Sequence, residues 1–296
     1  MSARLVTLIF WLLAAVLALG ITPLAKKMAL DEGDAALSIA LLIAFSTTLI
    51  SGVLVFIWLT AKKQLVDLKR LSKKDWRAVL VVGALGSGLV PLLGIIAMIE
   101  ASASNRALFQ SAYPVATAIA ARLILHERLN VLSYLWIGLI FIGLLLVNVQ
   151  PDAGLASLNW TFWPLLATLP LIGISDVIAK KALSDLQPEI IAFGRALGGV
   201  LVLFLLVPWM FTSIATTEWQ TWLWVLVAGA CMGVFAVALY QVFDRTLATV
   251  AASLIALAPL LTLVLEVSLL SLELDLLQWS GFVLVLISVL LLLRKA

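Results

Sequence analysis

Long apolar stretches separated by short polar segments follow one another along all 296 residues of the chain. Each stretch is about as long as the roughly 20-residue helix that crosses the hydrocarbon core of a bilayer. The strict alternation typical of membrane β-barrels is absent from the sequence. The pattern therefore predicts an all-α integral membrane protein with ten transmembrane helices. The expected spans are residues 4–25, 36–60, 78–100, 105–125, 129–149, 161–179, 189–211, 221–243, 248–272 and 276–293.

Two segments of the chain share one plan: an apolar helix with a proline in its middle, a short elbow, and a second apolar helix. They cover residues 105–149 and 248–293. Other landmarks recur in the same order and at nearly the same separation. The matched landmarks are Pro114 with Pro259, Ala25-Lys26-Lys27 with Ala179-Lys180-Lys181, and Trp76 with Trp222. Ordered matches of this kind predict an internal duplication, with a first repeat of five helices at residues 1–150 and a second at residues 151–296.

The composition agrees with a protein that lies in a lipid bilayer. Hydrophobic residues make up 64 % of the chain and charged residues 12 %, whereas charged residues form about a quarter of a soluble domain. The single cysteine, Cys231, excludes an intramolecular disulfide and a cysteine metal cluster. No metal-ligand cluster, phosphate-binding glycine loop or nucleophile–base pair is visible, so we expect neither a metal, nor a cofactor, nor enzymatic activity.

The distribution of Lys and Arg predicts the orientation. Seven basic residues lie in the loop at residues 61–77, and short basic loops stay on the cytoplasmic side. With alternating spans, fourteen basic residues fall on that side, and three (Lys26, Lys27 and Arg106) fall on the other. Both termini are then cytoplasmic. Because each repeat has an odd number of spans, the second repeat is inverted relative to the first.

The basic loop could instead bind nucleic acid or anionic lipid. We prefer the orientation signal, which explains the loop without a nucleic-acid partner. The sequence leaves the oligomeric state open, and a monomer is compatible with it.

A charged side chain inside a membrane span is costly and therefore a candidate for function. Glu266 follows Pro259 by two helical turns, with no basic residue nearby in sequence. We expect it either to line the solute cavity, as a proton site or a contact for a substrate amine, or to be a protonated acid bonded to a neighbouring helix. Arg195, near the inner end of its span, can instead reach the interface, and Asp176 is spaced to pair with Lys180. For three further residues, Glu100, Arg106 and Arg122, a role in anchoring or pairing explains the charge at least as well as a role in substrate binding.

Uncharged polar residues surround the two prolines of the duplicated segment. They are Gln110, Tyr113 and Thr117 near Pro114, and Ser253 and Thr262 near Pro259. Such groups can orient a small polar or zwitterionic solute between apolar walls. They could also be ordinary hydrogen bonds between helices. We take the five residues as candidate substrate-binding residues and the two prolines as candidate gating breaks.

Residues from Ala101 to Gly143, and again from Tyr240 to Gly281, combine a run of small residues that leads into a mid-helix proline, a short elbow with a glutamate, and a last helix that carries glycine. In this the chain resembles the drug/metabolite transporter superfamily and, within it, the EamA family. The resemblance covers essentially the whole chain. It implies a secondary transporter of small metabolites in the plasma (bacterial inner) membrane, an exporter or facilitator of amino acids or related polar, zwitterionic solutes that works by alternating access.

Other functions remain open from the sequence. Multidrug efflux or metabolite uptake are the alternatives within transport, and a membrane sensor or scaffold is the alternative outside it. A scaffold has no need of two proline-broken repeats. No soluble ATP-binding domain is visible, which argues against a primary pump on this chain.

Overall fold

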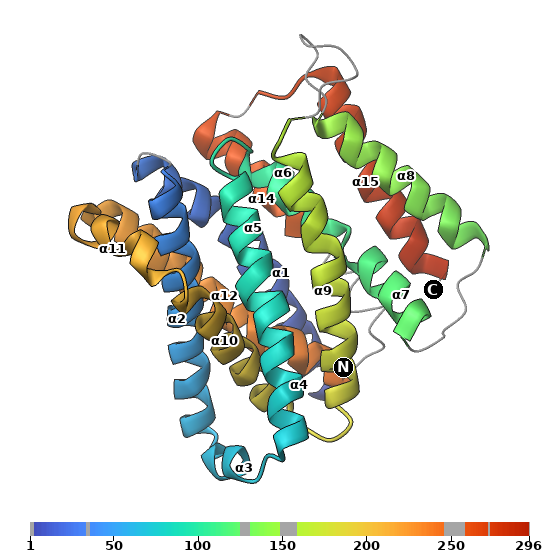
Figure 1. The fold of residues 1–296 in the computed structure, drawn as a ribbon. Coiled ribbons are helices and arrows are strands. Elements are labelled where there is room, and N and C mark those ends of the chain that lie inside the picture. The colour runs from blue at the N-terminus through green and yellow to red at the C-terminus, as the bar shows by residue number, and fades with distance from the viewer. Residues whose placement is uncertain are drawn as a thin grey trace.

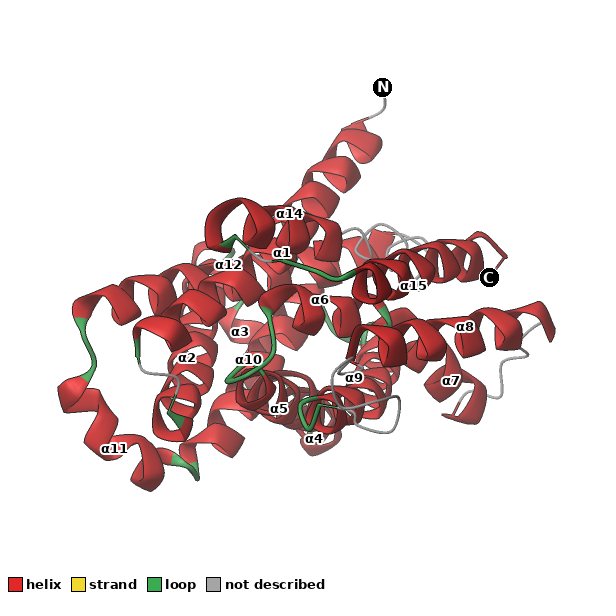
Figure 2. Ribbon diagram, turned by 90° about the horizontal axis from the view of Figure 1, so that it is seen from above, coloured by secondary structure: helices red, strands yellow, loops and turns green. Residues whose placement is uncertain are grey.

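The computed structural model describes residues 3–33, 36–124, 131–148, 159–245, 258–271 and 273–295. Every regular element in these ranges is helical, which confirms the all-α part of the predicted fold (Figures 1 and 2). The elements of the first half are α1 (Ala3–Glu32), α2 (Leu37–Ala61), α3 (Leu65–Lys69), α4 (Lys73–Gly83), the π-helix η1 (Ala84–Leu89), α5 (Val90–Ala97), α6 (Ala103–Ser111), α7 (Tyr113–Ile124) and α8 (Val131–Asn148). Those of the second half are α9 (Phe162–Ala182), α10 (Pro188–Phe204), α11 (Val207–Thr216), α12 (Trp219–Arg245), α14 (Ala258–Leu270) and α15 (Leu276–Lys295).

Six helical segments in the described part of the chain are long and apolar enough to cross a membrane. They are Val6–Glu32, Leu37–Ala61, Lys73–Ala97, Ala103–Ile124, Phe162–Ala182 and Trp219–Arg245. Three shorter apolar helices are Leu135–Val147, Ala258–Leu270 and Leu276–Leu291. Each segment overlaps a different expected span, and α10 lies in the span expected at 189–211. The chain is thus a multi-pass membrane protein, while the count of ten spans stays a prediction.

The contacts between helices of the two halves are matched: where a helix of the first half packs on a helix of the second, their counterparts pack on each other as well. α1 packs on α12 and α14, just as α9 packs on α4, α5 and α7. α2 packs on α12, just as α10 packs on α4 and η1. Two helices pack directly on their own counterparts: α2 on α10, and α8 on α15. In Figure 1, α1 rises from the lower end of the view whereas α9 descends from the upper end. This exchange is what two similar halves related by a two-fold axis produce.

Glycines allow close approach where counterpart helices cross. A Cβ atom built on Gly143 of α8 would lie 2.8 Å from the carbonyl oxygen of Gly281, and one built on Gly281 of α15 would lie 2.7 Å from that of Gly143. Gly20 of α1 and its counterpart Gly173 of α9 contact α14 and α7 in the same way, with the nearest atoms 2.8 Å and 2.5 Å from the built Cβ. A methyl group at any of these positions would force the helices apart.

The fourth span is interrupted beside Pro114. α6 ends at Ser111, α7 begins at Tyr113, and Ala112 forms the turn between them. Proline has no N–H to donate and its ring clashes with the carbonyl four residues before it, so the helix restarts there. Pro259 is the second residue of α14. Residues 246–257, which precede that helix, lie outside the described ranges.

Two features differ from the expected spans. The first helix does not end at residue 25 but continues to Glu32, which brings Lys26 and Lys27 into its last turns rather than into an outer loop. The third span contains the π-helical turn Ala84–Leu89, a local widening of the helix that occurs often at functional sites. The first difference arises because Ala29 and Leu30, which follow the two lysines, pack in a buried core cluster with neighbouring helices.

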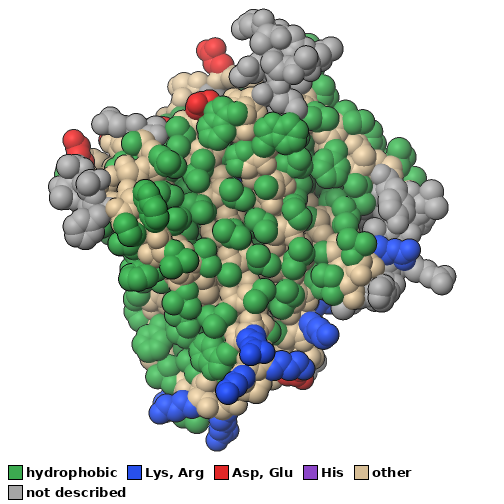
Figure 3. All heavy atoms as spheres, viewed as in Figure 1, with side chains coloured by type: hydrophobic (Ala, Val, Ile, Leu, Met, Phe, Trp, Pro, Cys, Tyr) green, Lys and Arg blue, Asp and Glu red, His purple; other side chains and the backbone are tan. Residues whose placement is uncertain are grey.

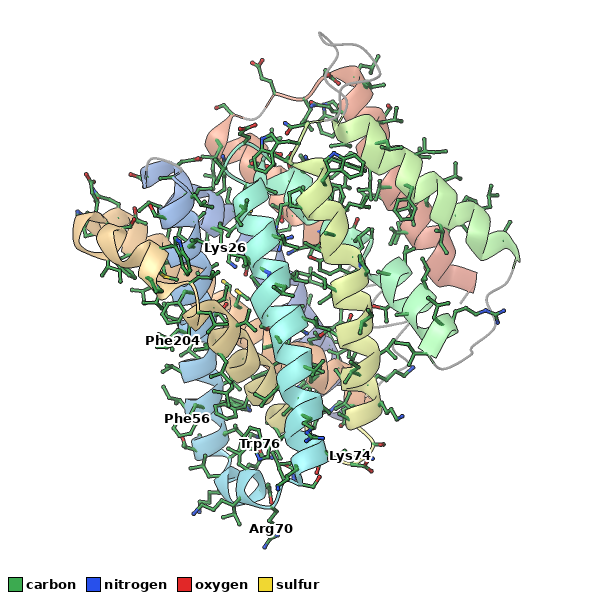
Figure 4. The ribbon with its side chains drawn as sticks, in the orientation of Figure 1. Lys26, Phe56, Arg70, Lys74, Trp76 and Phe204 are labelled. Atoms are coloured by element: carbon green, nitrogen blue, oxygen red, sulfur yellow. The ribbon has the colours of Figure 1, made fainter. Side chains whose placement is uncertain are left out.

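Basic side chains gather at one end of the molecule. Figure 3 shows Lys and Arg at the lower end of the face in view, and apolar side chains over the middle. Arg70 and Lys74, labelled in Figure 4, lie at this end, around α3 and the start of α4. An apolar belt bounded by a basic end is the surface expected of a membrane protein with that end in the cytoplasm.

Candidate solute site at the centre of the bundle

Arg195 lies in the middle of α10 and points into the bundle, where it is 7 % exposed. Its Nε donates to Ser87 Oγ at 3.1 Å, and its Nη1 donates to Tyr240 Oη at 3.0 Å. Its Nη2 donates to the carbonyl oxygen of Gly86 at 3.3 Å. The expectation that Arg195 reaches the inner interface is therefore wrong, because η1 and α12 supply acceptors for the guanidinium inside the protein.

The π-helical turn provides the space for this guanidinium. A Cβ atom built on Gly86 would lie 2.6 Å from Ser175 Oγ and 3.0 Å from Arg195 Nη2. Glycine at this position therefore lets α9 and the arginine approach the backbone of η1. The adjacent Ser87 then faces Nε of the same arginine.

Asp176 of α9 is the acidic member of the cluster. Its Oδ1 lies 3.9 Å from Arg195 Nη1, and its Oδ2 accepts a hydrogen bond from Thr117 Oγ1 at 3.1 Å. Oδ1 is buried and accepts no hydrogen bond from the described residues. The predicted pairing with Lys180 is wrong, since Lys180 is exposed while Asp176 faces Arg195 across the helix interface. One carboxylate oxygen thus remains ready to accept from a bound molecule.

The predicted substrate-binding residues separate into three groups. Thr117 contacts Asp176, and the half-buried Tyr113, one turn earlier on α7, accepts a hydrogen bond from Arg106 Nη1 at 3.4 Å. Thr262 is fully buried and donates to the carbonyl oxygen of Gly20 at 2.7 Å, so it joins α14 to α1. Two candidates stay apart from these contacts. Gln110 is half-buried and makes no side-chain hydrogen bond with the described residues, and Ser253 lies outside the described ranges.

Glu266 binds the start of α6 from the other half of the protein. Its Oε1 accepts from the backbone N–H of Ala103 at 2.7 Å and its Oε2 from that of Ser104 at 2.6 Å. These are N–H groups of a first helical turn, which have no partner within the helix, and negative charge is favoured there. Because both oxygens accept, the arrangement suits an ionised carboxylate. Glu266 is 2 % exposed and acts here as a cap that joins α14 to α6.

Three residues near these groups, Lys26, Ser87 and Tyr240, were not among the sequence candidates, and Arg106 was explained equally well by anchoring or pairing. Lys26 and Arg106 resembled residues of an outer loop, yet each is 5 % exposed. Ser87 and Tyr240 carry no charge, and only their contact with Arg195 singles them out. The sequence signal that could have found this cluster is Arg195 itself, an arginine set among alanines and glycines in the middle of an apolar helix.

The arrangement is suited to binding a small solute. Within the described ranges no three His, Cys, Asp or Glu side chains gather in a way that could hold a metal ion. The cluster offers one carboxylate oxygen without a hydrogen bond from the described residues, a guanidinium and hydroxyl groups inside an apolar bundle. Such a set recognises the charged and polar groups of a small solute.

Two similar halves, membrane-spanning helices and a polar centre define a multi-pass membrane transporter. The sequence model of the EamA-like transporter family matches residues 6–149 and again residues 159–294. The chain belongs to the EamA-like transporter family and has its two-repeat architecture, and it moves small solutes across a membrane.

Structural comparison gives the same fold. Of 28 matching solved chains, one crystal structure superimposes with a TM-score of 0.64 over 98 % of this chain and 98 % of its own, at 17 % sequence identity. At that identity the likeness speaks for the fold alone. A comparison with curated proteins found no match.

Proposed function

We propose that this protein is a secondary transporter that carries a small zwitterionic metabolite, an amino acid or a related compound, across the bacterial inner membrane. It works as an exporter or facilitator by alternating access. The observation that carries the proposal is the buried Asp176–Arg195 pair, in which Asp176 Oδ1 has no hydrogen bond from the described residues. A solute ammonium group is the natural donor to that oxygen, because a buried acceptor without a partner is unfavourable.

The surroundings of the pair support a role in transport. Asp176, Arg195 and Tyr240 come from three helices of the second half, and Thr117 and Ser87 come from the first. A change in the packing of one half against the other would therefore alter the cluster directly. A binding site shared by two repeats is the arrangement on which alternating access depends.

The inverted arrangement and the orientation belong to the same proposal. The exchange of helix contacts between the halves and the opposite directions of α1 and α9 support inverted repeats. The basic end around α3 supports cytoplasmic termini. Two of the three basic residues assigned to the outer side, Lys26 and Arg106, are buried within the bundle, which strengthens the charge difference between the two ends.

The proposal is tested by exchange of labelled amino acids in vesicles that contain the purified protein. For alanine as a probe, we expect unlabelled zwitterions to compete at lower concentrations than propionate and ethylamine, which each keep only one of its charged groups. Asp176→Asn is expected to slow the exchange about tenfold to a hundredfold, the range for a lost hydrogen bond to a charged group. Exchange of lipophilic cations with no exchange of any amino acid would point to multidrug efflux instead.

A further inference from the structure

Lys26 is a buried lysine for which the structure provides no counter-charge. It lies six residues before the end of α1 and is 5 % exposed. Figure 4 shows it within the bundle, in the half opposite to Arg70 and Lys74. Its ammonium group makes no hydrogen bond or ion pair with the described residues, whereas the adjacent Lys27 pairs with Asp31 at 3.0 Å and donates to the Met98 carbonyl at 3.1 Å.

A second buried cation lies beside it. Arg106, in the first turns of α6, is also 5 % exposed, and it packs against Gly94 of α5, where no side chain separates the guanidinium from the helix backbone. α1 packs directly on α6, the helix that carries Arg106. The only hydrogen bond that the structure gives to the Arg106 guanidinium among the described residues is the one to Tyr113.

Among the residues that the structure describes, no carboxylate pairs with either cation. Glu266, the buried acid at this end of the bundle, has both oxygens bound to backbone amides of α6. Asp31 pairs with Lys27, and Asp176 faces Arg195 and Thr117. Two like charges without an anion are costly in a low-dielectric interior, and groups held at such a cost in a transporter mark the path of its solute.

We propose that Lys26 and Arg106 form a subsite for an anionic group of the transported solute, a carboxylate or a phosphate. The inference rests on the proposed transport function and adds to it the position of the anionic end. Tyr113 joins the subsite to the central cluster. Its hydroxyl accepts a hydrogen bond from Arg106, while Thr117, one turn further along α7, donates to Asp176. A solute can thus place its amine at Asp176 and its anionic group between Lys26 and Arg106.

The thermal stability of the ligand-free protein distinguishes an anion subsite from a structural role for Lys26. Lys26→Gln removes a charge that lacks a partner, so the ligand-free variant should melt at a higher temperature than the wild type. If Lys26 held the helices together through a contact, the same substitution would lower the melting temperature. Lys180→Gln is the matched control, since Lys180 is the counterpart of Lys26 in the second repeat and is exposed.

Direct binding of minimal anions tests the subsite. Acetate and inorganic phosphate are titrated into the full-length protein in lipid nanodiscs, and we expect saturable binding of at least one of them. Lys26→Gln and Arg106→Gln should each weaken that binding about tenfold or more, while Lys180→Gln should leave it unchanged. Tighter binding of acetate assigns a carboxylate solute and tighter binding of phosphate a phosphorylated one, and both results support the subsite.

The subsite is disproved if Lys26→Gln binds both anions as tightly as the wild type, or if this variant melts at a lower temperature in anion-free buffer. The two proposals fail separately. Anion binding that depends on Lys26, without exchange of any solute in vesicles, would reject the transport proposal only. Amino-acid exchange at an unchanged rate in Lys26→Gln would reject the subsite only.

Discussion

Replacing Arg195 with lysine is expected to reduce transport at least tenfold while the folded protein remains abundant. Lysine keeps the positive charge beside Asp176, so the buried carboxylate is still compensated. A single ammonium group cannot reproduce the planar fork that bonds Ser87, Tyr240 and the Gly86 carbonyl together. The measurement pairs the exchange rate in vesicles with the yield of monodisperse protein after solubilisation, and Arg77→Lys, at an exposed position, is the control.

Removing the positive charge of Arg195 should have a different effect from replacing it with lysine. Arg195→Leu leaves Asp176 buried without a counter-charge, which costs about 3–5 kcal/mol and should deplete the folded protein. Combining it with Asp176→Asn should recover the folded protein but not the transport. A fully active and abundant Arg195→Leu variant would contradict the assignment of this pair to the solute site.

Glu266→Gln is expected to lower stability by about 1–3 kcal/mol, because one of the two acceptors that cap α6 becomes an NH2 group facing a backbone N–H. The remaining transport should keep its dependence on a pH gradient, since the structure explains Glu266 as a cap between α14 and α6. Thermal unfolding and gradient-driven uptake are measured on the same preparation. Glu273→Gln, at an exposed position, serves as the control.

The opposite pattern would establish Glu266 as a proton site. In that case Glu266→Gln would abolish accumulation driven by a pH gradient and spare exchange at equal concentrations. Its stability would then match that of the wild type. A substrate-dependent proton flux in vesicles that disappears in the variant would lead to the same conclusion.

The helices could be predicted from the sequence because their main determinant is local. An apolar run of sufficient length has to become a helix in lipid, and the order of landmarks such as Pro114 and Pro259 disclosed the duplication. The end of α1 was misplaced for a physical reason. Two consecutive lysines are typical of a membrane interface, but Ala29 and Leu30, which follow them, lie in a buried cluster with residues of α2, α5 and α6, so the helix continues to Glu32.

The central cluster could not be assembled from the sequence because its contacts join different helices. Spacing along one helix suggested Asp176 with Lys180, yet the partner that the structure provides is Arg195 on α10. Ser87 and Tyr240 gain their importance only from how η1 and α12 pack around that arginine. The depth of a charged residue in its span was a poorer guide than the direction in which it points.

The orientation and the central site are tested together by the accessibility of single cysteines to an impermeant thiol reagent. The measurement uses a variant in which the native Cys231 is replaced by serine, with one cysteine in place of Lys69, Thr117 or Glu218. Position 69 is expected to react only from the cytoplasmic side and position 218 only from outside. Position 117, beside Asp176, should react from either side, and the transported solute should slow its reaction. Labelling of position 69 in intact cells would contradict the orientation, and a position 117 that is indifferent to solute would contradict the central site.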